Sequence, residues 1–142
     1  MNRKQAVTAW IFRIVGLSGM LAIVAVVMPF SWMAATHEYL GLGKMPEGAI
    51  VEYLARSLSA IYAVVGVVLW KVSFRFAEQL ELVRLLGYVF TVFGAAIWWI
   101  GAKAGMPLSW VLLEGPPTIL FGLWVVYACR QEGEATPPEN AG

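Results

Sequence analysis

The spacing of charged residues limits the fold of this chain more than any motif does. Lys, Arg, Asp and Glu make up only 13% of its 142 residues, about half the usual share of a soluble domain. They leave a 23-residue window, Ile14 to Thr36, without a single charge. A helix needs about 20 apolar residues to cross a bilayer, so this window predicts a transmembrane helix.

Three further windows predict three more spans. Leu85 to Ala102 holds 18 residues and is long enough with Leu82 and Val83 added. The other two windows hold only 14 and 15 residues, 57–70 and 115–129. Helices there reach the necessary length only by starting near Ala49 and Pro107, which places three charged residues inside them: Glu52, Arg56 and Glu114. We therefore predict an all-α fold, a four-transmembrane-helix bundle formed by a single domain over residues 1–130.

Prolines and the tail complete this prediction. We expect the first span to run from near Thr8 to near Met33, with Pro29 bending its last turn. Gly115-Pro116-Pro117 predicts a fourth helix that is kinked or broken there, because proline lacks a backbone donor and disfavours helical geometry in the residue before it. Residues 131–142 are polar and contain Pro137-Pro138, which predicts a disordered cytoplasmic tail.

Basic residues predict the orientation. Seven of the ten Lys and Arg residues fall on one side of the predicted spans: Arg3, Lys4, Arg13, Lys71, Arg75, Arg84 and Arg130. Cytoplasmic loops are enriched in Lys and Arg, so both termini should be cytoplasmic, and the 37–48 and 103–107 loops should lie outside. Tryptophan and tyrosine residues gather near both predicted boundaries, as in other membrane proteins.

Small residues predict which faces pack. Ala55, Ser59 and Ala63 recur at four-residue spacing on the second predicted helix, and Gly87, Thr91 and Ala95 recur on the third. Small residues let membrane helices approach closely. We expect these two faces to meet each other.

The charges inside the spans form the candidate site. Glu52 and Arg56 lie four residues apart, so they share a helix face and can pair. Arg56 and Glu114 are both expected about 10 Å below the outer boundary, where they should face inward and neutralise each other. His37, with Glu38 and Lys103, could cover this cluster from outside.

Three interpretations of the cluster are open. It could be a structural ion pair that fixes helix register, or a polar pocket for the head of an amphipathic ligand such as a lipid or quinone. It could also be a proton-coupled transport site. A net charge of +1 argues against nucleic acid as a partner. One cysteine, Cys129, and one histidine predict no disulfide and no metal site, and no residue is predicted to be catalytic.

The second predicted helix resembles the DoxX-like group of small four-helix bacterial membrane proteins. The resemblance rests on Glu52-Tyr53-Leu54-Ala55-Arg56-Ser57 followed by Ser59-Ala60-Ile61-Tyr62-Ala63-Val64-Val65-Gly66, and on chain length and helix number over about residues 8–129. It implies a bundle in the bacterial inner membrane and a quinone or lipid partner. It implies no catalytic residue.

These observations predict a non-catalytic membrane subunit or a binding protein for a lipid or quinone, with Glu52, Arg56, Glu114 and His37 as candidate ligand-binding residues. No other cofactor is expected. Partners should be the bilayer, other copies of the chain or a larger membrane complex. The alternative is a small proton-coupled transporter of the four-helix type.

Overall fold

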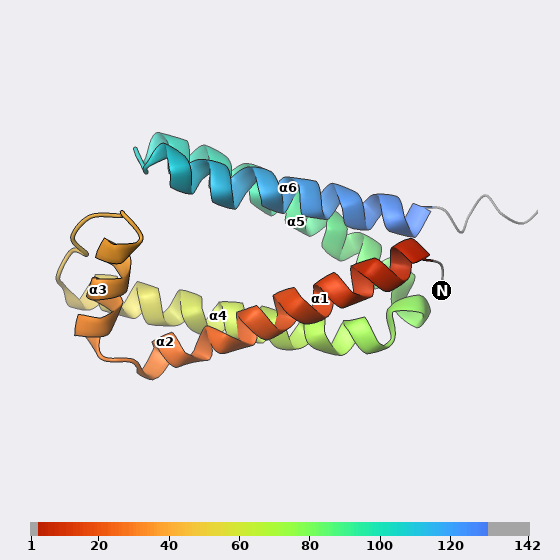
Figure 1. The fold of residues 1–142 in the computed structure, drawn as a ribbon, viewed down its shortest axis with the longest axis horizontal. Coiled ribbons are helices and arrows are strands. Elements are labelled where there is room, and N and C mark those ends of the chain that lie inside the picture. The colour runs from red at the N-terminus through yellow and green to blue at the C-terminus, as the bar shows by residue number, and fades with distance from the viewer. Residues whose placement is uncertain (1–2, 131–142) are drawn as a thin grey trace, which may run out of the picture. The chain divides into compact units, whose positions relative to one another are not determined.

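The computed structural model describes residues 3–130, which are helical throughout most of their length and contain no β-strand. In chain order the helices are α1 (Arg3–Leu21), α2 (Ile23–Val27), α3 (Phe30–Tyr39), α4 (Ala49–Phe74), the 3₁₀ helix η1 (Phe76–Gln79), α5 (Leu80–Lys103) and α6 (Leu108–Arg130) (Figure 1). The all-α prediction is confirmed. The predicted tail, residues 131–142, lies outside the described residues.

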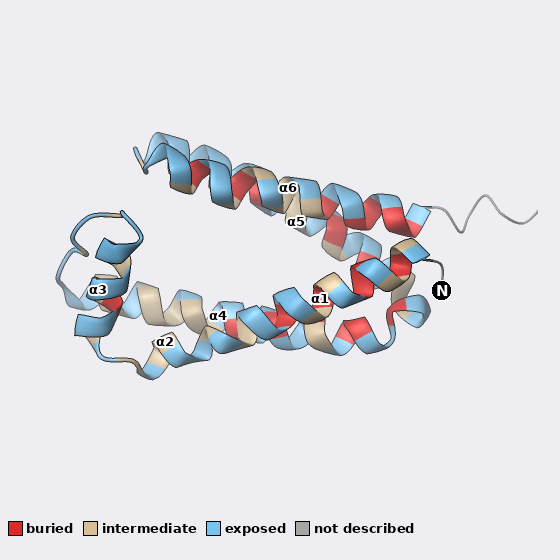
Figure 2. Ribbon diagram, viewed as in Figure 1, coloured by how far each residue is buried: buried red, intermediate tan, exposed pale blue. Residues whose placement is uncertain are grey.

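Four helical stretches are long and apolar enough to cross a membrane: Arg3–Val27, Ala49–Phe74, Phe76–Lys103 and Leu108–Arg130. Their number agrees with the prediction, and they are compatible with a multi-pass membrane protein. Many of their residues are exposed (Figure 2). In the first and third stretches, only 11% of the apolar 18-residue window is buried. Exposed side chains include large apolar ones such as Val27 and Leu113, which a bilayer would cover.

The chain forms two compact units. One comprises Ala9–Phe74, with most of α1 and all of α2, α3 and α4. The other combines the start of the chain, as far as Thr8, with Arg75 and the residues after it, including η1, α5 and α6. Each unit contains two long apolar helices that pack on each other.

The first long helix ends earlier than predicted. A turn at Ala22 separates α1 from α2, and α2 stops at Val27. Met28 and Pro29 have extended backbones, with ψ of 144° and 141°. A residue before proline disfavours helical geometry, so Pro29 ends this span, and the predicted continuation to near Met33 is wrong. His37 consequently belongs to α3, a separate helix.

Glycines bring α1 and α4 into backbone contact. A Cβ atom added at Gly66 would lie 2.5 Å from the Met20 nitrogen and 2.6 Å from the Gly16 carbonyl oxygen. Ala63 is buried one turn earlier on the same face of α4. This face, which the sequence predicts to meet the third span, packs on α1.

Glycines also join α5 to α6. A Cβ atom added at Gly122 would lie 2.5 Å from the Thr91 nitrogen and 2.6 Å from the Gly87 carbonyl oxygen. One at Gly94 would lie 2.7 Å from the Ile119 nitrogen. Gly87 and Thr91, predicted to face the second span, therefore pack on α6.

The predicted break in the fourth helix is absent. α6 continues through Pro116 and Pro117 from Leu108 to Arg130. Gly115 fits tightly on α5, since a Cβ atom there would lie 2.5 Å from that of Trp98, and Thr118 Oγ1 donates a hydrogen bond of 2.6 Å to the Glu114 carbonyl. The Glu114 carbonyl is not one of those that the prolines leave without a donor, so close packing on the neighbouring helix is the feature that supports α6 here.

Candidate functional site

Glu52 and Arg56 form the ion pair predicted from their spacing. Arg56 Nε donates to Glu52 Oε1 at 2.9 Å, and Nη2 donates to the same oxygen at 2.6 Å. Both residues lie in the first two turns of α4, which begins at Ala49. The Glu52 side chain is 42% exposed and the Arg56 side chain 28% exposed, so neither charged group is fully buried in the protein.

Arg56 has a second partner, a backbone carbonyl near the end of α2. Its Nη1 donates to the carbonyl oxygen of Val26. The last four carbonyls of a helix lack an intrahelical donor, and α2 ends at Val27 because Pro29 follows. The guanidinium therefore caps α2 and connects it to α4. Its positive charge also complements the dipole at the C-terminal end of α2.

The pair retains hydrogen-bonding capacity. A guanidinium has five N–H donors, of which three make the bonds to Glu52 and Val26. Two N–H groups of Arg56 and the Oε2 atom of Glu52 have no protein partner within their unit. A donor pair and a carboxylate oxygen are thus held side by side and partly exposed.

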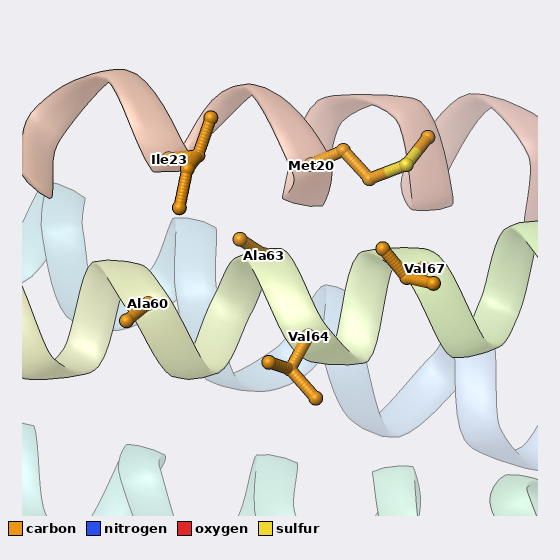
Figure 3. Close-up of a pocket in the computed structure, with 6 residues that line it drawn as sticks. All are labelled: Met20, Ile23, Ala60, Ala63, Val64 and Val67. Atoms are coloured by element: carbon orange, nitrogen blue, oxygen red, sulfur yellow. The ribbon is translucent and has the colours of Figure 1, made fainter.

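An apolar hollow lies next to the pair along the same two helix stretches. It has a volume of about 410 Å³ and is lined by side chains from both stretches: Met20, Ile23, Ala60, Ala63, Val64 and Val67 (Figure 3). Ala60 is four residues after Arg56, and Ile23 is three residues before Val26. These offsets correspond to one helical turn, or about 5 Å. The ion pair is therefore about one helical turn from the nearest lining residues of this open apolar hollow.

Glu114 belongs to the other unit, where its carboxylate accepts a hydrogen bond of 2.9 Å from Trp110 Nε1, one turn earlier on α6. Among the described residues of that unit, 3–8 and 75–130, no Lys or Arg side chain forms an ion pair with it. Its neutralisation by Arg56 would join residues of the two units and stays a prediction.

His37 is placed in the last turn of α3, within the same unit as Glu52 and Arg56. Its Nδ1 lies 2.9 Å from the Gly43 carbonyl oxygen, across the segment that leads to α4. This hydrogen bond closes the turn after α3. A role for His37 in covering the ion pair stays a prediction. Among residues 3–130, no group of three His, Cys, Asp or Glu residues could hold a metal ion.

The sequence interpretation missed the Val26 carbonyl and the apolar hollow. Pro29 was a usable signal for the first, because a helix that ends before proline leaves carbonyls for a nearby arginine. The hollow had no comparable signal, since it depends on which helix α4 contacts. Comparison of the chain with protein-family models, with curated proteins and with solved structures finds no match.

Proposed function

We propose that this chain is a non-catalytic multi-pass protein of the bacterial inner membrane that binds an amphipathic ligand, a lipid or a quinone, at Glu52 and Arg56. It would act alone, as a homo-oligomer or as a subunit of a larger membrane complex. The adjacency of a partly exposed ion pair and an apolar hollow carries this proposal. The resemblance of residues 52–66 to the DoxX-like group points to the same ligand class and location.

The polar end of the ligand would meet Arg56 and Glu52. The two unpartnered N–H groups of Arg56 suit a phosphate or a quinone carbonyl oxygen. Both existing partners of Arg56, Glu52 and the Val26 carbonyl, hold the guanidinium in place. Less side-chain freedom is then lost when the ligand binds.

The apolar end of the ligand would occupy the hollow between α1, α2 and α4. Its lining residues are aliphatic apart from the Met20 thioether, which suits an acyl or isoprenoid chain. The seven-to-three distribution of basic residues supports a site near the outer leaflet, with both termini in the cytoplasm. Glu114 and His37 are further candidates for contact with the head.

Arg56→Met should lower retention of the co-purified lipid or quinone about tenfold, because it removes two or more charge-assisted hydrogen bonds to the head. Native mass spectrometry of the full chain in detergent measures this retention. Arg84→Met is the matched control, because Arg84 is an exposed arginine on α5. It should leave retention unchanged.

A second variant separates ligand binding from the structural role of Arg56. Ala60→Leu should fill part of the hollow and weaken retention while the Glu52–Arg56 pair stays intact. Full retention in Ala60→Leu, or a wild-type protein that never carries a ligand, contradicts the proposal. The ion pair would then serve only to cap α2 and hold it on α4.

Proton-coupled transport is the second candidate, and Glu114 favours it. Its carboxylate lies inside a predicted span, and its hydrogen-bond donor there is the neutral indole of Trp110. Ionisable groups inside membrane spans commonly mark proton pathways. Under this alternative, Glu114→Gln abolishes proton-dependent substrate flux in liposomes, whereas Glu47→Gln, in the loop before α4, does not. Flux that persists in Glu114→Gln would exclude this mechanism.

A further inference from the structure

Arg13 is held between two aromatic rings on α1 and α4. Its guanidinium carbon lies 4.9 Å from the ring centre of Trp10 and 4.6 Å from that of Phe74. Phe74 is itself fixed by an edge contact with Trp70 at 5.4 Å. Two ring faces therefore stabilise the charge and restrict the side chain.

The same guanidinium lacks hydrogen-bond acceptors. Its Nε atom is buried without a partner, and its two Nη atoms, which are not buried, make no hydrogen bond to residues 9–74. Ring faces attract the cation but do not replace acceptors for a fork of five N–H donors. The buried Nε is closed to an outside acceptor, but unsatisfied charged donors are costly, so we expect the Nη groups to bind an acceptor from outside this unit.

No carboxylate of its own unit can serve as that acceptor. The acids of this unit are Glu38, Glu47 and Glu52, on α3, in the loop that follows it and in the first turn of α4. Glu52 and Phe74 are 22 residues apart on α4, or about 33 Å. The nearest charge on the last turn of α4 is another cation, Lys71.

The surroundings of Arg13 match the head-group level of a bilayer. Phe74 ends α4, and Trp10 and Phe74 are 61% and 57% exposed, so their outer faces would contact lipid. Tryptophan is enriched at the membrane boundary, and arginine side chains extend toward it. The acceptors abundant at this level are phosphate oxygens of phospholipids, which the planar guanidinium can bind with two parallel hydrogen bonds.

We propose that Arg13, flanked by Trp10 and Phe74, binds the phosphate of a phospholipid head group in the leaflet at the Phe74 end of α4. This site is separate from the Glu52–Arg56 pair, which lies at the opposite end of α4. It does not depend on the function proposed above. The basic residues predict that this leaflet is the cytoplasmic one.

The test is titration of the full chain in detergent with phosphatidylglycerol, followed by native mass spectrometry. Arg13→Met should weaken binding of one lipid about tenfold, in the wild-type background and equally in Arg56→Met. Arg13→Lys should restore binding only in part, because lysine keeps the charge but loses the fork. Arg84→Met, with the same change in net charge, should bind as the wild type does.

Three outcomes would overturn the assignment. Equal lipid binding by wild type and Arg13→Met excludes Arg13 as the contact. Displacement of the lipid by excess inorganic phosphate would indicate a site for the free ion instead. If Arg13→Met does not fold, Trp10→Leu with Phe74→Leu provides the decisive variant, because it keeps the arginine and removes both rings. Unchanged lipid binding in that variant also contradicts the proposal.

Discussion

Gly66→Ala should destabilise the packing of α1 on α4 by about 2 kcal/mol or more. The added Cβ would lie 2.5 Å from the Met20 nitrogen, 2.6 Å from the Gly16 carbonyl oxygen and 2.8 Å from the Gly19 carbonyl carbon. All three are backbone atoms, so no side-chain rotation relieves the overlap and the helices must separate. Alanine gains about 1 kcal/mol in helix propensity over glycine, which the overlap outweighs.

Gly101→Ala is the matched control for this prediction. Gly101 is also inside a long apolar helix, α5, but its added Cβ would meet only the Val111 Cγ2 atom, at 3.3 Å. That variant should therefore be as stable as the wild type or slightly more so, since the propensity gain is not opposed by a backbone clash. Unfolding by sodium dodecyl sulfate, followed by circular dichroism, compares the two. Equal stability of Gly66→Ala and Gly101→Ala would contradict the close packing of α1 on α4.

The number of long apolar helices could be predicted because charge-free length is a local property of the sequence. The effect of proline could not. Pro29 ends α2, whereas Pro116 and Pro117 lie inside a continuous α6. The difference is tertiary: Gly115, directly before Pro116, is packed tightly on Trp98 of α5, while Val27, two residues before Pro29, is 81% exposed. Packing holds α6 helical where the local preference opposes it.

Small-residue spacing predicted the contact faces but not their partners. The faces around Ala63 and Thr91 are both used for close packing, on α1 and α6 respectively. Small residues at four-residue spacing indicate only that another helix can approach this face closely. This spacing carries no information about which helix approaches, because several helices of this chain have small residues at suitable positions.

In the candidate site, too, contacts within one helix could be predicted from the sequence, whereas contacts between helices could not. Pairing of Glu52 with Arg56 follows from their spacing on one helix and is present. The bond from Arg56 to the Val26 carbonyl could not be found among side chains, because its acceptor belongs to the backbone. The sequence indicates Arg13 only as one of the basic residues on the predicted cytoplasmic side. Its position between Trp10 and Phe74 depends on the contact of α1 with α4.

Gly122→Ala and Gly87→Ala should both destabilise the α5–α6 pair, but only the second should be rescued by a side-chain truncation. A Cβ at Gly87 would lie 2.8 Å from Val126 Cγ2, and its closest backbone contact, the Gly122 carbonyl oxygen, is at 3.0 Å. Val126→Ala removes the nearest of these atoms. We expect the double variant Gly87→Ala with Val126→Ala to be more stable than the sum of the single changes by about 1 kcal/mol.

At Gly122 the same strategy should fail. The added Cβ would overlap Thr91 Oγ1, and it would also lie 2.5 Å from the Thr91 nitrogen and 2.6 Å from the Gly87 carbonyl oxygen. Thr91→Ala removes the hydroxyl and the methyl group but no backbone atom, so the two backbone overlaps stay and the coupling free energy should be near zero. Double-mutant cycles from detergent-induced unfolding measure both couplings. Rescue of Gly122→Ala by Thr91→Ala would show that α5 and α6 contact through side chains there, whereas its absence, with rescue at Gly87, places their backbones in direct contact at Gly122.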